Sequence, residues 1–173
     1  EFLKKIVQEA ASKSQHSLVR DVLQGRKDEF VIKGYEHKGV FTKIDGLAAY
    51  YQANLSLLQA DTRAGLFQES APIYTKVGDN APVKYGLESN VKNSLVADGC
   101  MIEGTVENCV LFRGVKIAKG AVVRNCVLMQ GTEIGEGCNI DAIVADKNVT
   151  ISENRVLTGS PEYPLYLGKK AMI

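Results

Sequence analysis

Four cysteines and two histidines are the side chains of this sequence best suited to metal, redox or nucleophilic chemistry. They are Cys100, Cys109, Cys126 and Cys138, together with His16 and His37. No two cysteines form a CxxC pair, the spacing that is typical of zinc and redox sites. We therefore predict no metal site, and we expect reduced thiols in a cytoplasmic protein.

The composition is that of an ordinary globular protein. Of 173 residues, 45% are hydrophobic and 24% are charged, and the net charge is only +1. Such a balance argues against a disordered chain and against nucleic acid as a partner. The apolar runs are far shorter than the roughly 20 residues that a membrane-spanning helix needs, so we expect no membrane partner. The chain begins with Glu1 and Phe2 rather than Met, so we expect a piece of a longer polypeptide.

The first forty residues predict two short helices and two short strands. Apolar residues recur at helical spacing over 2–12 and 17–24. Ser17 is a suitable N-cap for the second helix, and Gly25 a suitable left-handed terminator. The runs at 30–32 and 40–42 predict strands at the edge of a sheet.

A longer helix is predicted over 46–59, with Asp45 as its N-cap. Its apolar face consists of Leu47, Tyr51, Leu55 and Leu58. Prolines and glycines then interrupt residues 61–90, which indicates an irregular linker with a few short strands.

From residue 91 the sequence repeats with a shift of 17 residues. The segment 107–112 returns as 124–129. Three aligned columns contain Ile117, Ile134 and Ile151, then Val106, Val123, Ile140 and Leu157, and the cysteine pair Cys109 and Cys126. The first turn is shorter, because Leu95 and Ile102 match Val110 and Ile117 at a shift of 15. A period of this length predicts a repeat architecture.

Within each period the aliphatic residues come six apart, as in Leu111, Ile117 and Val123. This hexapeptide rhythm is typical of a three-sided parallel β-helix, in which each short strand points one aliphatic side chain inward. Small residues then fill the corners, at Val115, Ala121, Thr132 and Cys138. We predict a mainly β protein with about four coils of a left-handed β-helix.

The β-helix explains the cysteines as packing residues. Cys109 and Cys126 share one column in consecutive coils, and a buried thiol behaves as a small hydrophobe. A disulfide between them is the alternative, because stacked strands lie about 5 Å apart.

The segments beside the repeat resemble the C-terminal half of bacterial ADP-glucose pyrophosphorylases (glucose-1-phosphate adenylyltransferases). That family carries the motifs AYW-x-AN, PIYT, NS-hydrophobic-V-x-x-GC and G-TVENS. This chain has similar motifs at 49–54, 72–75, 93–100 and 104–108, in the same order and with similar spacing. The resemblance runs from about residue 30 to the C-terminus.

The resemblance implies the C-terminal assembly and regulatory part of a subunit that forms ADP-glucose and pyrophosphate from ATP and glucose 1-phosphate, in glycogen biosynthesis. Residues 1–60 would be the remnant of a nucleotidyltransferase domain, 61–90 a linker, and 91–173 the β-helix with its C-terminal cap. The family's GGxGxRL nucleotide loop is absent from the sequence. We therefore expect the chain to be inactive alone, with no catalytic or cofactor-binding residue of its own.

One position departs from the family motif WRDVGT, whose Asp is a ligand of the catalytic Mg²⁺. The alignment places Lys43 on that Asp, and an ammonium group repels a metal ion. Mg²⁺ is thus implied only for the intact catalytic complex. Loss of the ligand is what the resemblance implies for a GlgD-type subunit, a non-catalytic or weakly catalytic paralogue that pairs with the catalytic subunit. Asp45 lies two residues further on and is better explained as the helix N-cap.

Two other functions stay open. One is the C-terminal half of a catalytic subunit of the same family. The other is a hexapeptide-repeat acyltransferase, which commonly needs a histidine on a coil as its general base. Both His16 and His37 precede the repeat, which disfavours an acyltransferase.

The C-terminal tail and the open ends of the β-helix bear on partners. Residues 160–170 are suited to cap the last coil, because an uncovered strand edge invites pairing with another chain. Lys169 and Lys170 could contact an anionic effector, or could simply be exposed. We expect a homo-oligomer, or a hetero-oligomer with the catalytic adenylyltransferase subunit.

Overall fold

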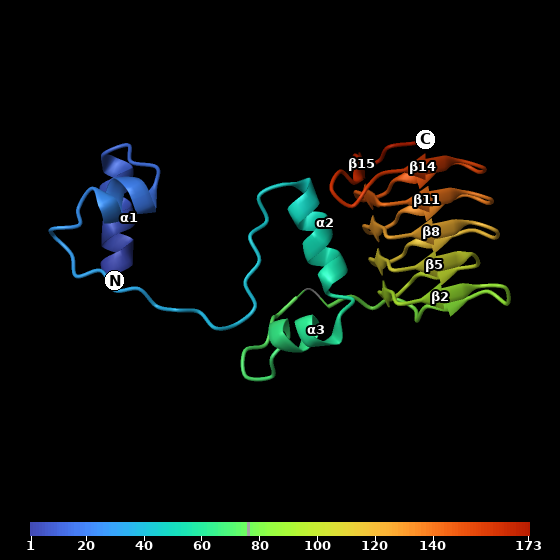
Figure 1. Ribbon diagram of the computed structural model, residues 1–173, viewed down its shortest axis with the longest axis horizontal. Helices are drawn as coiled ribbons and strands as arrows, with labels where there is room; N and C mark the ends of the chain where they lie inside the picture. Colours follow the sequence, from blue (N-terminus) through green and yellow to red (C-terminus); the bar gives the residue numbers. More distant parts are fainter. Residues whose placement is uncertain (76) are drawn as a thin grey trace. The chain divides into compact units, whose positions relative to one another are not determined.

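A computed structural model describes residues 1–75 and 77–173 of the chain (Figure 1). It contains two compact units, Glu1–Lys38 and Gly39–Ile173. The division falls earlier than the expected boundary at residue 60, so the helix expected over 46–59 belongs to the second unit.

The first unit is a pair of helices, α1 (Phe2–Ser12) and η1 (Leu18–Gln24). α1 is the helix expected over 2–12. η1 has π-helical hydrogen bonding, and Ser17 caps it by accepting a bond from the backbone N–H of Arg20 at 3.2 Å. Ile6 and Val22 are the buried apolar residues of the pair. Gly25 ends η1 as expected, but with φ −68° it is right-handed, so the predicted left-handed conformation was wrong.

The strands predicted at 30–32 and 40–42 are not formed. Phe30 packs its ring edge-on against Phe2, with the centroids 5.6 Å apart, and Arg26 lies 4.6 Å from its centroid. Two short strands without further partners are marginal in water, and here a local aromatic contact is formed instead.

The second unit opens with α2 (Leu47–Ser56) and α3 (Ala60–Leu66). α2 is the expected long helix, but its N-cap is Gly46, which makes no side-chain cap bond. The predicted capping role of Asp45 was therefore wrong. α3 lies at the start of the segment expected as a linker and was not predicted.

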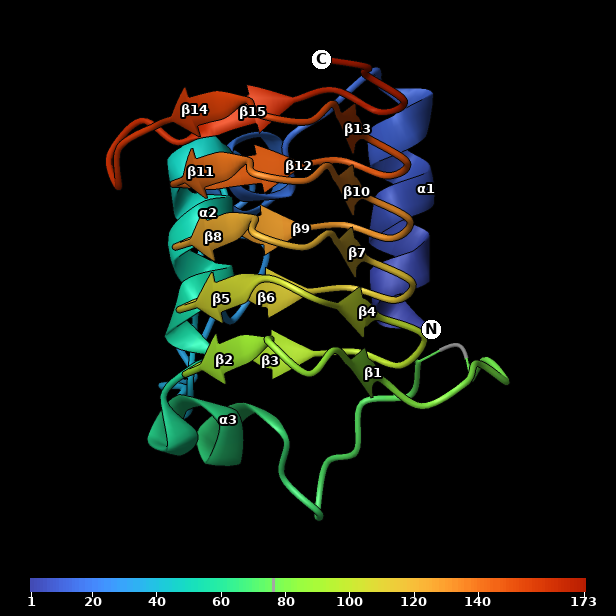
Figure 2. The same ribbon diagram turned by 90° about the vertical axis from the view of Figure 1, so that its right-hand side faces the viewer.

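The rest of the second unit is a three-sided parallel β-helix (Figure 2). Within the described residues it has three five-stranded sheets. The first sheet contains β1 (Lys84–Tyr85), β4 (Met101–Ile102), β7 (Lys116–Ile117), β10 (Glu133–Ile134) and β13 (Thr150–Ile151). The second contains β2 (Asn90–Lys92), β5 (Thr105–Glu107), β8 (Val122–Arg124), β11 (Asn139–Asp141) and β14 (Val156–Thr158). The third contains β3 (Leu95–Val96), β6 (Val110–Leu111), β9 (Val127–Leu128), β12 (Ile143–Ala145) and β15 (Leu165–Leu167).

The strand register confirms the predicted repeat. Ile117 pairs with Ile134, and Ile134 with Ile151, at the predicted shift of 17. Leu95 pairs with Val110 at the predicted shift of 15. From β1 to β13 the chain makes four turns, and the aliphatic columns point into one continuous core. The predicted corner residues Val115, Ala121, Thr132 and Cys138 are buried in it.

One corner of the first three coils is an asparagine in the left-handed conformation. Asn93, Asn108 and Asn125 have φ of 41°, 53° and 49°. Their amides bond from coil to coil, at 2.7 Å between Asn93 and Asn108 and at 3.3 Å between Asn108 and Asn125. Asparagine tolerates this backbone conformation better than most residues, because its short side chain can hydrogen-bond locally.

The C-terminal residues cover part of the last coil. Backbone N–H groups of Thr150 and Ser152 donate to the carbonyls of Ala171 and Ile173, at 2.9 and 2.7 Å. The chain beyond β15 therefore continues the first sheet past β13, which satisfies part of the strand edge.

Candidate functional site

The main intramolecular contact of the β-helix in the second unit is with helix α2. Tyr51 of α2 is 1% exposed and packs against Val127, Ala142 and Val144 on the third sheet and its corner. Its hydroxyl donates a hydrogen bond to the backbone carbonyl of Asn125 at 2.7 Å. Burial raises the pKa of Tyr51 to about 12. The tyrosine is thus held neutral, with its one donor used.

A second bond fixes the same helix. The side-chain amide of Gln52 donates to the carbonyl of Pro161 at 3.0 Å, in the loop before β15. Tyr50 and Leu55 pack around the cluster of Tyr51. Residues in the segment 49–54, which carries the family resemblance, therefore attach α2 to the β-helix.

The structure places Lys43 on the exposed segment before α2. Its ammonium group forms an ion pair with the carboxylate of Asp45 at 3.0 Å, and the two side chains are 74% and 61% exposed. A lysine cannot act as a magnesium ligand, and one paired carboxylate is a poor substitute for a cage of oxygen ligands. The residues at this position therefore do not fit Mg²⁺.

No group of three or more histidine, cysteine, aspartate or glutamate side chains is arranged to hold a metal within 1–75 and 77–173. His16 and His37 are exposed residues of the first unit. The backbone N–H of His16 donates to Asp21 at 3.1 Å.

The four cysteines are buried and carry free thiols. Cys109 and Cys126 stack in consecutive coils, with the N–H of Cys126 donating to Sγ of Cys109 at 3.4 Å. Burial, and then the neighbouring Cys109, raises the pKa of Cys126 well above the usual value. These thiols pack as small apolar groups, as predicted, and the alternative disulfide is not formed.

Lys169 and Lys170 lie in the turn that follows β15, and both are exposed. Lys170 has φ 61°, and its N–H donates to the carbonyl of Lys147 at 3.0 Å. Neither lysine forms an ion pair within the described ranges. Their ammonium groups are therefore directed to solvent at the C-terminal end of the β-helix.

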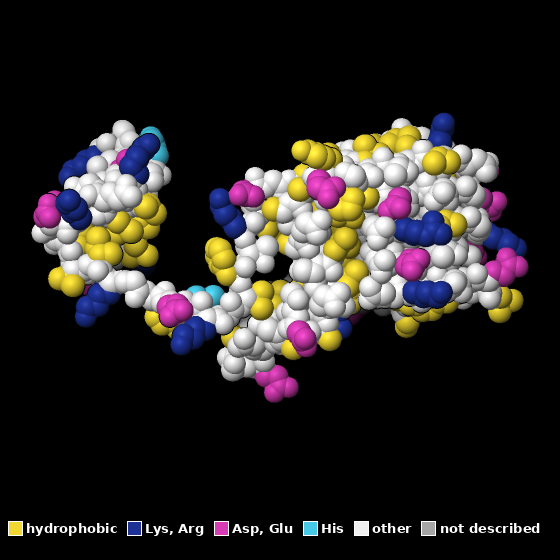
Figure 3. All heavy atoms as spheres, in the orientation of Figure 1, with side chains coloured by type: hydrophobic (Ala, Val, Ile, Leu, Met, Phe, Trp, Pro, Cys, Tyr) yellow, Lys and Arg dark blue, Asp and Glu magenta, His cyan; other side chains and the backbone are white. Residues whose placement is uncertain are grey.

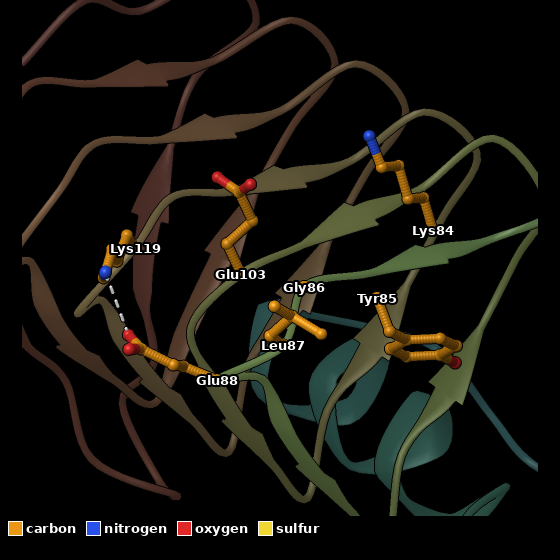
Figure 4. A pocket seen from close by; sticks show the side chains of 7 residues that line it. All are labelled: Lys84, Tyr85, Gly86, Leu87, Glu88, Glu103 and Lys119. Atoms are coloured by element: carbon orange, nitrogen blue, oxygen red, sulfur yellow. Dashed lines mark ion pairs between the residues drawn. The ribbon is translucent and has the colours of Figure 1, made fainter.

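A hollow of about 390 Å³ lies beside the first coil (Figure 4). Its lining consists of Lys84, Tyr85, Gly86, Leu87, Glu88, Glu103 and Lys119. Lys119 and Glu88 point toward one another and form an ion pair at 3.1 Å, which raises the pKa of Lys119. Two lysines and two glutamates leave the lining without a net charge. The hollow therefore has no chemistry that selects an anion or a cation.

Sequence reasoning did not find this hollow. The repeat gives part of the signal, because pairing of Tyr85 with Ile102 brings Gly86 level with Glu103. The ion pair of Glu88 with Lys119 follows from no motif.

No helix in the described part of the chain is long and apolar enough to span a membrane.

Comparison with known proteins finds relatives of the β-helix and of most of the chain. Residues 81–162 match the family described as GlmU-like, C-terminal hexapeptide. The glycogen biosynthesis protein GlgD of Bacillus subtilis (strain 168) is 43% identical over 158 residues, which is 91% of this chain and 46% of that protein. Another similar protein is the glucose-1-phosphate adenylyltransferase of Geobacillus stearothermophilus. It is 39% identical over 115 residues, or 64% of this chain and 29% of that protein.

The chain thus spans about half the length, or less, of the curated relatives that it matches. The GlgD of Geobacillus stearothermophilus is 62% identical over a shorter stretch of 71 residues. The match to the Bacillus subtilis protein covers 91% of the chain and so includes both the α2 segment and the β-helix. By sequence and by fold, this chain is similar to the C-terminal parts of GlgD proteins and of glucose-1-phosphate adenylyltransferases.

Proposed function

We propose that this chain is the assembly and regulatory portion of a GlgD-type subunit, which associates with a catalytic glucose-1-phosphate adenylyltransferase subunit. The complex would form ADP-glucose and pyrophosphate from ATP and glucose 1-phosphate in the cytoplasm, for glycogen synthesis. The similarity to GlgD over 91% of the chain is the observation that carries this proposal.

The β-helix supports an assembly role because it is a rigid body with regular faces. Its core is continuous through all coils, and α2 is fixed to it by the buried Tyr51. Repeat structures of this kind offer extended surfaces to partners, and their open ends need cover. Such a body can hold subunits in a fixed relation without performing chemistry itself.

The position of Lys43 supports a non-catalytic role. Its ammonium group is neutralised by Asp45 at an exposed site that does not fit a magnesium ion. Mg²⁺ and the catalytic residues would then come from the catalytic subunit. An anionic effector near Lys169 and Lys170 is the finer regulatory proposal, supported by two exposed ammonium groups without ion-pair partners in the described residues.

The direct test is association. We would mix this 173-residue chain with a catalytic adenylyltransferase subunit from the same cell and follow sedimentation velocity. We expect a heavier mixed species, while the chain alone releases no pyrophosphate from ATP and glucose 1-phosphate. Separate sedimentation of the two proteins would contradict the assembly role.

A catalytic subunit is the second candidate, favoured by the 39% identity to a glucose-1-phosphate adenylyltransferase. Pyrophosphate release by the longer parent polypeptide distinguishes the two. Activity only in the presence of the catalytic subunit supports the GlgD-type proposal. Strong magnesium-dependent activity of the parent alone supports the second candidate. The variant Lys43→Asp then tells whether this position limits turnover, with the exposed Lys38→Asp as a matched control.

A further inference from the structure

The second sheet of the β-helix has a column of alternating charges on its outer face. Its strands are three residues long, and the middle residue of each points into the core. The last residues of β2, β5, β8 and β11 align in register, as Lys92, Glu107, Arg124 and Asp141. We call these four residues the charge ladder. Figure 3 shows acidic and basic side chains alternating over these strands.

The ladder is only partly neutralised within the chain. Arg124 and Glu107, in its middle, form a loose ion pair at 3.7 Å, with both side chains 44% exposed. Lys92 and Asp141, at its two ends, form no ion pair with any described residue. Asp141 accepts one hydrogen bond, from the side-chain amide of Asn125 at 2.8 Å. The two end charges lie three coils apart, about 14 Å at the usual strand spacing, so they cannot meet in one chain.

The rest of this face is flat. The first residues of the same strands also point outward and form a second column, which contains Asn90, Thr105, Val122 and Asn139. All are exposed or half-buried, and none is bulky. A sheet with short outer side chains can approach another sheet to about 10 Å. The face therefore fits another flat surface with a matching order of charges.

We propose that the second sheet packs against the same sheet of a second copy of this chain, in antiparallel orientation. The two-fold axis runs parallel to the strands, midway between β5 and β8. This operation places Lys92 opposite Asp141 of the second copy, and Glu107 opposite its Arg124. All four ladder charges then face an opposite charge, and the two unpaired ends pair with each other. The ladder is self-complementary in this register, as a two-fold interface requires.

The inference deepens the proposed assembly role and rests on it. A face of this size is small beside the roughly 800 Å² that a standard interface buries on each partner. The dimer is therefore weak and reversible, and the ladder chiefly fixes orientation and register, as complementary charges do at interfaces.

Charge exchange between the two ends of the ladder tests the pairing. Lys92→Asp brings two carboxylates together at each of two symmetric contacts, and Asp141→Lys brings two ammonium groups together. We expect either single variant of the 173-residue chain to raise the dimer dissociation constant by at least about tenfold in sedimentation velocity at low salt. The double variant restores opposite charges across the interface, and we expect it to recover most of the dimer.

The double variant separates this inference from a purely internal role of the ladder. Within one chain, Lys92→Asp stands beside Glu107, and Asp141→Lys beside Arg124, so both changes are unfavourable and their effects add. Recovery in the double variant can arise only between copies. Lys84→Asp, the same charge change on the first sheet, is the matched control and leaves the dissociation constant unchanged.

Each outcome decides the matter. A double variant that dimerises no better than the single variants overturns the antiparallel pairing. A dimer that all the ladder variants leave intact shows assembly through another face, so the proposed function survives while this inference fails. A wild-type chain that stays monomeric up to several hundred micromolar overturns self-association, whereas binding to a catalytic subunit is tested separately. Lys92→Gln and Asp141→Asn, which only neutralise charge, give intermediate weakening if a reversed variant folds poorly.

Discussion

Helix α2 is attached to the β-helix chiefly by Tyr51, so substitutions at this residue should release the helix without unfolding the coils. In Tyr51→Phe the ring stays in place, but the carbonyl of Asn125 loses the donor 2.7 Å away. A buried acceptor left without its partner costs about 1–3 kcal/mol. At about 1.4 kcal/mol for each factor of ten, amide exchange through undocking of α2 should be about 5 to 150 times faster.

Tyr51→Ala removes the ring as well, and large-to-small changes of this kind cost about 3–5 kcal/mol. We expect residues 47–56 to lose protection in hydrogen–deuterium exchange, while the amides of β8 and β9 keep theirs, because the core columns do not include Tyr51. Tyr74→Ala is the matched control, since that tyrosine is 91% exposed. If α2 stayed protected in Tyr51→Ala, or if the coils lost protection together with it, the docking argument would be refuted.

Three further predictions concern titration, thiols and one corner. Because the pKa of Tyr51 is raised to about 12, the docked state favours the neutral phenol, so docking stability is complete below pH 10 and falls as the pH rises from about 10 to 12. A tyrosine NMR titration should show a late signal that Tyr51→Phe removes. The four buried thiols should react with a thiol reagent at least about a hundredfold more slowly in the native chain than in urea, and rapid native reaction would contradict their burial. Gly135→Ala should lower the melting temperature by several degrees, because its Cβ would lie 2.6 Å from the backbone nitrogen of Glu153, whereas Gly168→Ala, with open space, should not.

The repeat was predictable because the strand register of a β-helix appears in the sequence as a fixed spacing of apolar residues. Each coil must present an aliphatic residue to the core at the same point, so Ile117, Ile134 and Ile151 appear at equal spacing and stack as that spacing requires. The shorter first shift was equally predictable, because Ile102 and Ile117 lie 15 residues apart in the sequence and pair in consecutive coils.

Local signals outside the repeat were less reliable. The apolar runs at 30–32 and 40–42 suit strands, but a strand forms only with a partner, and the partner is a property of the whole fold. Asp45 is a good capping residue by type, yet its carboxylate pairs with Lys43, and Gly46 occupies the cap. Of the predicted apolar face, Tyr51 and Leu55 pack on the β-helix, whereas Leu47 is 37% exposed and Leu58 lies beyond the end of α2. The residues that the face contacts were not predicted, because helical periodicity does not say what a face packs on.

The corner under α2 explains why one coil departs from the asparagine column. The position that follows Asn125 in the column is Ala142, with φ 51°, a conformation that alanine adopts only at some cost. Asparagine would relieve that cost, but its amide would lie beneath the ring of Tyr51, where Ala142 is 3% exposed in the apolar cluster with Val127 and Val144. The side-chain amide of Asn125 donates instead to the carboxylate of Asp141, so the last asparagine of the column still has a hydrogen-bond partner. The alanine at this corner therefore indicates that α2 packs there. In the sequence, the replacement of asparagine by alanine in this column marks the coil that α2 contacts.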